Sequence, residues 1–168
     1  MEELIMTPGM NDVYFMIDYS EDVQVTYCGS NLFKAVQIAE DKKNILLEDK
    51  RFHNIKLDVP AAIGGYRWYC DEKDILLRII GVSFMNHSYH DNGYTNISSM
   101  YINVGNTKIR FFFINNNIYA TDTINLYQYI GTTENIVSLS DLVKKAIHFM
   151  DNHIDYPVVG QVISLIEE

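Results

Sequence analysis

Two histidines and an aspartate stand close together in a spacing that could bind a metal ion. His87 and His90 are three residues apart, and Asp91 follows directly. Imidazole nitrogens and carboxylate oxygens bind zinc and other divalent ions, given a further ligand from elsewhere in the chain. The stretch is rich in Asn, Ser and Gly, and no glutamate beside it could serve as a general base. A metal-dependent enzyme is therefore kept as an alternative to the simpler interpretation, two surface histidines with no cofactor.

The other groups that could catalyse a reaction lack the settings that catalysis needs. The chain contains no Gly-x-Ser-x-Gly sequence, no Gly-x-Gly-x-x-Gly sequence and no phosphate-binding Gly-Lys-Ser/Thr. Cys28 and Cys70 end predicted strands, where free cysteines usually serve as small core residues. Glu21 and Asp22 are neighbours in sequence, so they do not face one another and predict solvated charge rather than an acid–base pair. We therefore expect a protein that is not an enzyme.

The segment 86–99 has the composition of an adaptable binding loop. It carries tyrosines among Asn, Ser and Gly, with one Asp and no Lys, Arg or Glu. Tyrosines offer rigid contact area, and the small polar residues offer flexible hydrogen bonds. Aromatic residues at 66–69 lie in a predicted strand where some must face outward. The residues predicted to contact a partner are Tyr89, Asn92, Tyr94, Trp68, Glu21 and Asp22.

The charge of the chain favours a basic partner. Its formal net charge is −9, and no Lys or Arg precedes Lys34. Such a potential repels phosphate backbones, so we expect no direct binding of nucleic acid. It attracts a basic protein and speeds the encounter. Solubility alone is the competing explanation.

Several features predict a cytoplasmic protein that does not enter a membrane. No apolar run approaches the roughly 18 to 20 residues that span a bilayer. The first residues lack the basic and apolar regions of a secretory signal. Two cysteines are too few for a disulfide framework.

Alternating apolar and polar residues predict an antiparallel sheet built from hairpins. Turns are expected at 19–22, 71–74 and 115–117, and the nearly all-apolar strand at 75–85 is expected to be central. The predicted strands are 12–18, 23–28, 55–59, 66–70, 75–85, 100–104, 108–114, 118–121 and 124–130.

Helical spacing appears in three places. Ser30 is the expected N-cap of a short helix over 31–41. Ser138 and Asp141 form a capping-box pattern before apolar residues at helical spacing. The segment 158–166 is predicted as a second C-terminal helix, with a closing strand as the alternative. We therefore expect an α+β fold, an antiparallel sheet with one short helix in the N-terminal half and C-terminal helices packed on one face, as a single domain over 1–168.

These observations favour a small acidic binding protein that neutralises a protein partner. Two settings fit: an immunity protein against a basic toxin nuclease, and a phage inhibitor of a host nuclease or CRISPR-type defence complex. The Asn-, Ile-, Lys- and Tyr-rich composition is typical of a low-GC bacterial or phage genome. The second alternative, beside the enzyme, is an oligomerising module that uses the apolar face of the C-terminal helix as its seam.

Overall fold

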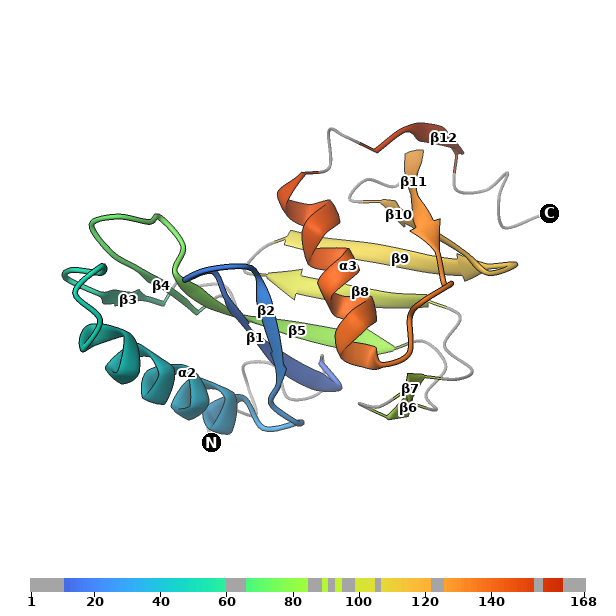
Figure 1. Cartoon of the computed structure of the whole chain (residues 1–168). Coiled ribbons are helices and arrows are strands. Elements are labelled where there is room, and N and C mark those ends of the chain that lie inside the picture. Colours follow the sequence, from blue (N-terminus) through green and yellow to red (C-terminus); the bar gives the residue numbers. More distant parts are fainter. Residues whose placement is uncertain are drawn as a thin grey trace. The chain divides into compact units, whose positions relative to one another are not determined.

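The computed structural model describes residues 11–59, 66–84, 89–90, 93–94, 99–104, 107–121, 126–152 and 156–161. Its strand pairs are antiparallel, and two helices accompany them, which confirms the predicted α+β class (Figure 1). The chain divides into two compact units. Unit 1 comprises 1–83 and 102–107, and unit 2 comprises 84–101 and 108–168. The single domain over 1–168 and the common face for the helices stay predictions.

Unit 1 is built on the predicted hairpins. β1 pairs with β2 in the register Ile17 to Val25, and with β5 in the register Phe15 to Ile80. All residues of β1 are buried, as are nearly all of β5, so the prediction of a buried, central β5 is confirmed. The described elements of this unit are β1 (Val13–Asp18), β2 (Gln24–Tyr27), α2 (Leu32–Leu47), β3 (Lys56–Asp58), β4 (Arg67–Tyr69) and β5 (Leu77–Phe84).

The helix α2 differs from its prediction at both ends. Its N-cap is Asn31 rather than Ser30, and the Asn31 Oδ1 atom accepts hydrogen bonds from the N–H groups of Phe33 (2.8 Å) and Lys34 (3.1 Å). Asparagine caps a helix as well as serine does. The helix also continues to Leu47, because the run from 40 to 47 consists mostly of good helix formers and ends on the buried Leu46.

The core of unit 1 lies between α2 and the strands. Ala35 and Ala39 of α2 are fully buried, and the absence of longer side chains there leaves room for Trp68 of β4. Trp68 is also fully buried, and its indole N–H donates a hydrogen bond to the Glu40 carboxylate at 2.9 Å. β4 pairs with β3 and with β5, which confirms the predicted hairpin across 71–74.

Unit 2 carries the predicted meander. β9, β10, β11 and β12 pair in sequence order, and the first residues of β8 also belong to this unit. The turn before β10 uses Asn115 and Asn116 at φ of 50° and 67°, a backbone conformation that asparagine tolerates better than most residues. The strands are β8 (Ser99–Val104), β9 (Thr107–Ile114), β10 (Asn117–Thr121), β11 (Leu126–Thr132) and β12 (Val158–Gln161).

The helix α3 (Leu139–Asp151) begins at the predicted cap. The Ser138 hydroxyl accepts from the Asp141 N–H at 3.0 Å, and the Asp141 carboxylate accepts from the Val137 N–H at 3.1 Å. The apolar face of α3 is buried, and Phe149 meets Phe111 edge to face at 5.9 Å between ring centroids. The oligomerising module stays a prediction.

The segment after α3 corrects one prediction. Residues 158–161 form the strand β12, so the helix favoured over 158–166 is wrong there and the alternative strand is correct. Val158 and Val159 suit a strand, and pairing with β11 decides the outcome. Residues 162–168 lie outside the described residues. Neither described helix is long and apolar enough to cross a membrane.

Candidate partner-binding site

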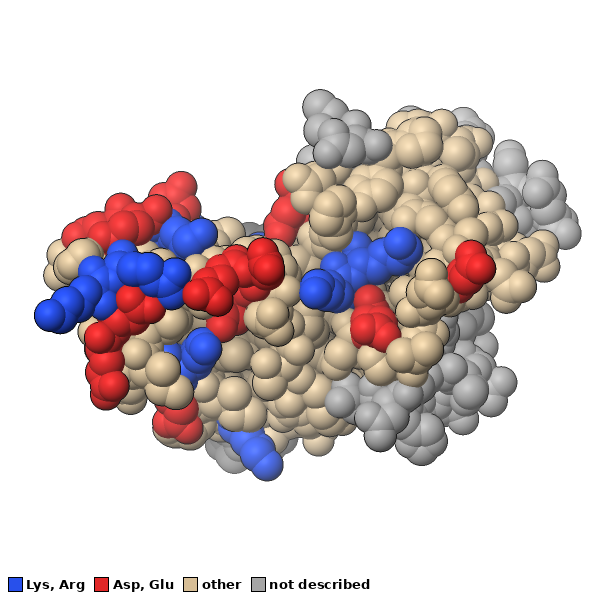
Figure 2. Space-filling view, in the orientation of Figure 1, with Lys and Arg blue, Asp and Glu red and all other residues tan. Residues whose placement is uncertain are grey.

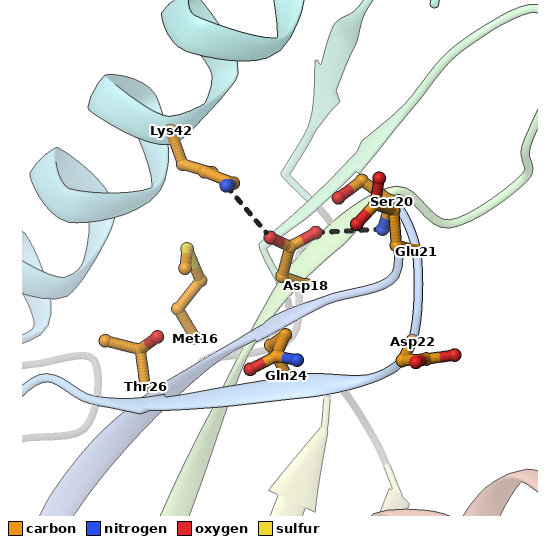
Figure 3. A pocket seen from close by; sticks show the side chains of 8 residues that line it. All are labelled: Met16, Asp18, Ser20, Glu21, Asp22, Gln24, Thr26 and Lys42. Atoms are coloured by element: carbon orange, nitrogen blue, oxygen red, sulfur yellow. Dashed lines mark hydrogen bonds and ion pairs between the residues drawn. The ribbon is translucent and has the colours of Figure 1, made fainter. Parts of the chain in front are cut away.

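A pocket of about 400 Å³ lies beside the β1–β2 hairpin in unit 1 (Figure 3). The register pairs Met16 with Thr26 and Asp18 with Gln24, so these four residues share one face of the hairpin. Lys42 reaches this face from α2. The pocket is lined by Met16, Asp18, Ser20, Glu21, Asp22, Gln24, Thr26 and Lys42.

Asp18 is the buried charge of this pocket. Its side chain is only 7% exposed, and one carboxylate oxygen lies 3.4 Å from Lys42 Nζ. The other oxygen accepts a hydrogen bond from the Ser20 N–H at 2.8 Å, which fixes the carboxylate at the end of the hairpin. Both oxygens therefore have partners, as a buried carboxylate requires.

Glu21 and Asp22 make the mouth of the pocket acidic. Both residues are exposed, and the Glu21 side chain is 71% exposed. Arg51 lies 3.3 Å from Glu21 but makes a shorter contact with Asp49, at 2.7 Å. An exposed pair of this kind contributes little and leaves Glu21 able to meet another cation. The structure thus brings the predicted residues Glu21 and Asp22 together with Asp18, which the sequence analysis did not single out.

Acidic groups predominate among the charged side chains that line the pocket. Its polar groups are carboxylates, an amide, hydroxyls and one ammonium group, and the lining residues include neither histidine nor cysteine. Acidic and basic side chains alternate on the visible face around α2 and β3, so the negative charge here is local rather than continuous (Figure 2). A hollow with carboxylates at its mouth fits a long cationic side chain.

Replacing Lys42 by methionine is expected to lower the free energy of unfolding by about 1–2 kcal/mol, because the buried Asp18 carboxylate loses its cation. The loss stays below the roughly 3–5 kcal/mol of a fully buried pair, since Lys42 is 34% exposed and water can partly replace it. Urea unfolding measures the change. The control is Lys43→Met on the same helix, where a partly exposed pair with Glu40 should cost less than about 1 kcal/mol. Equal losses in the two variants would contradict a special role for Lys42.

The tyrosine-bearing segment contains a short hairpin where the sequence predicts an irregular loop. β6 (Tyr89–His90) pairs with β7 (Gly93–Tyr94). The register places Tyr89 opposite Tyr94 and His90 opposite Gly93. The two predicted contact residues are thus direct partners in one ladder. Asn92 lies outside the described residues.

The metal interpretation stays a prediction. Within the part of the chain that the structure describes, no three His, Cys, Asp or Glu side chains are grouped so as to hold a metal ion. His87 and Asp91 lie outside that part, and His90 is placed only as a residue of β6.

Trp68 does not belong to an accessible surface. Its side chain is fully buried in the core of unit 1, so Trp68 is not among the aromatic residues of this strand that face outward. The neighbours Tyr66 and Tyr69 are half-buried, and the Tyr66 ring stacks on Trp68 at 6.5 Å between centroids. The alternation of a three-residue strand does not reveal which face is covered.

The cysteines are core residues, as predicted. Cys28 and Cys70 are free thiols and both are buried. Burial disfavours the thiolate and raises the pKa of Cys28 to about 11. Because the thiolate is the nucleophile, the raised pKa lowers the reactivity of Cys28 at neutral pH.

The contact between His53 and Glu72 was not predicted from the sequence. His53 Nδ1 lies 2.6 Å from a carboxylate oxygen of Glu72, whose other oxygen accepts from the His53 N–H at 2.9 Å. This hydrogen bond raises the pKa of His53 and lowers the pKa of Glu72. Both groups are solvated, so the pair ties the turn at 71–74 to the segment after α2 without forming an enclosed site. The residues are 19 apart in sequence, and no local pattern predicts their contact.

Comparisons with protein-family models, curated proteins and solved structures found no match.

Proposed function

We propose that this chain is a non-enzymatic binding protein that holds and neutralises a basic protein partner. The observation that carries the proposal is the pocket of unit 1, with Glu21 and Asp22 exposed at its mouth. A lysine or arginine side chain of the partner would enter it and gain charge-assisted hydrogen bonds from these carboxylates. The partner is of the nuclease or nucleic-acid-binding class, in a bacterial immunity or phage anti-defence setting in the cytoplasm.

The overall charge of the chain supports this partner class. A net charge of −9 attracts a basic protein over several ångströms and raises its rate of association. Proteins that bind nucleic acid carry basic patches that match such a field. The pocket would then provide the short-range contact that sets orientation.

The hairpin β6–β7 supplies a second contact in this proposal. Tyr89 and Tyr94, register partners in this hairpin, are the proposed contact residues, because tyrosine is enriched among the residues that dominate protein interfaces.

A pair of charge-reversed variants tests the proposal. The immobilised chain is expected to recover one dominant basic protein from cells of its source, and capture should weaken as salt rises because exposed charges are screened. Glu21→Lys with Asp22→Lys should weaken the affinity for that purified partner by about tenfold or more in calorimetry.

The matched control changes the net charge equally at exposed sites that do not line the pocket, as Glu134→Lys with Asp151→Lys. Its affinity should remain within about twofold of the unmodified chain. Equal losses in the two double variants would show that only net charge matters, and the pocket would then not be the site. Turnover of a small molecule by the isolated chain would end the non-enzymatic proposal.

A further inference from the structure

The strand β2 forms an edge of the sheet in unit 1. It pairs with β1 on one side, and none of the described strands pairs with its other side. Gln24, Thr26 and Tyr27 are exposed, and Val25 is half-buried. An open edge of this kind presents backbone donors and acceptors that another chain can use.

The hydrogen-bond pattern of the hairpin shows which groups face the open side. The Cys28 N–H donates to the Tyr14 carbonyl at 2.9 Å, so this register pair is hydrogen-bonded. Hydrogen-bonded and non-hydrogen-bonded pairs alternate along an antiparallel ladder. Thr26 and Gln24 therefore bond to β1, and the N–H and C=O groups of Val25 between them point away from β1.

This edge lacks the features that usually block strand addition. Natural edge strands are often protected by proline, lysine or an inward-pointing charge. The sequence of β2 is Gln-Val-Thr-Tyr, which contains none of these and consists mainly of residues that favour strands.

The acidic pocket adjoins the same strand. Gln24 and Thr26 of β2 line it together with Asp18 of β1 and the turn residues Glu21 and Asp22 (Figure 3). Strand addition gives affinity through the backbone, while pockets beside the edge select alternate side chains of the added segment. Here the pocket would select a cation.

We infer that β2 receives an extended segment of the basic partner as an additional strand, with one Lys or Arg side chain seated in the pocket. The inference rests on the proposed function and specifies how the partner is bound. The charge of the pocket mouth determines the sign of that side chain, and the outward-pointing backbone groups of Val25 determine the extended conformation of the segment.

Amide hydrogen exchange with a defined peptide provides the test. The probe is a capped nine-residue peptide of alternating valine and lysine, added to the full chain. Without peptide, the Val25 N–H should exchange quickly, while the N–H groups of Gln24 and Thr26 are protected by β1. With peptide, exchange at Val25 should slow by about tenfold or more, and the other two should be unchanged.

Two variants separate the backbone contact from the side chain of Val25. Val25→Pro removes the outward N–H, and proline is tolerated where the missing N–H would face solvent. It should weaken peptide binding by about tenfold, whereas Val25→Ala keeps the N–H and should stay within about twofold. If Val25→Pro does not fold, the peptide methylated on alternate amide nitrogens takes its place and should bind the unmodified chain about tenfold more weakly.

Peptide binding without slower exchange at Val25, or equal affinity for the proline and alanine variants, would overturn strand addition. Failure of the peptide to bind at millimolar concentration would overturn it as well. None of these results decides the proposed function, because capture of the partner and its loss on charge reversal at Glu21 and Asp22 are measured independently of the peptide.

Discussion

Substituting Trp68 by alanine should lower the free energy of unfolding by about 3–5 kcal/mol, the largest loss expected for a single substitution in unit 1. Trp68 is the largest of the fully buried side chains and packs in the core that includes Ala35 and Ala39 of α2. Those small residues cannot fill the space, so the variant keeps a cavity. Urea unfolding followed by circular dichroism measures the loss, since Trp68 is the only tryptophan and its fluorescence disappears with it.

Trp68→Phe separates the volume of the ring from its hydrogen bond. Phenylalanine fills most of the space but cannot donate to Glu40, so a loss of about 1–2 kcal/mol is expected. The pKa of Glu40 is lowered chiefly by the hydrogen bond from Lys43, and the bond from Trp68 contributes. The stabilisation that accompanies a lowered carboxyl pKa is present at neutral pH and is lost as the pH falls through that pKa. The difference in the free energy of unfolding between Trp68→Phe and the unmodified chain should therefore shrink in acid. A loss below about 1 kcal/mol for Trp68→Ala would contradict the burial of the ring.

The sequence predicted those parts of the fold that depend on neighbouring residues. The β1–β2 hairpin, the β4–β5 hairpin and the meander of unit 2 follow from alternating or continuous apolar runs interrupted by turn residues. The start of α3 follows from Ser138, whose capping hydrogen bond spans three residues. In each case the residues that decide the structure lie within a few positions of one another.

The parts that were missed depend on distant residues. The face of β4 that is covered depends on α2, and the Glu40 carboxylate that receives the Trp68 N–H lies 28 residues away in the sequence. Val158 and Val159 suit a strand or a helix, and the partner strand β11 decides between them. The end of α2 depends on where Leu46 is buried, which apolar periodicity alone did not show.

The candidate site also combines residues that the local sequence predicts with residues that only tertiary packing places there. Glu21 and Asp22 were predicted from the acidic charge of the first 33 residues, which contain no Lys or Arg. Asp18 could have been added from the register of that hairpin, because its cross-strand partner Gln24 shares its face. Lys42 could not have been predicted from the sequence, since its approach to Asp18 depends on how α2 packs against β1.

Adding a single methyl group at Gly81 should destabilise unit 1 by about 1–3 kcal/mol, the cost of overpacking a tight core. A Cβ atom at this position in β5 would lie 2.3 Å from Cγ and 2.4 Å from Oδ1 of Asn11. Asn11 is buried, and its Oδ1 atom accepts a hydrogen bond from Asn103 Nδ2 at 2.6 Å. To make room in Gly81→Ala, the Asn11 side chain must move, and a shift large enough to relieve the clash breaks this bond in a buried setting.

A double-mutant cycle identifies the Asn11 side chain as the cause. Asn11→Ala alone should cost about 1–2 kcal/mol, because Asn103 loses its acceptor. In that background Gly81→Ala should cost less than about 0.5 kcal/mol, since the atoms that it would meet are gone, which gives a coupling of about 1 kcal/mol or more. Unfolding in urea, compared over the four chains, measures it. If Gly81→Ala lowers the free energy of unfolding equally with and without the Asn11 side chain, then the loss arises from the β5 backbone itself. The packing of Asn11 against Gly81 would then not be its cause.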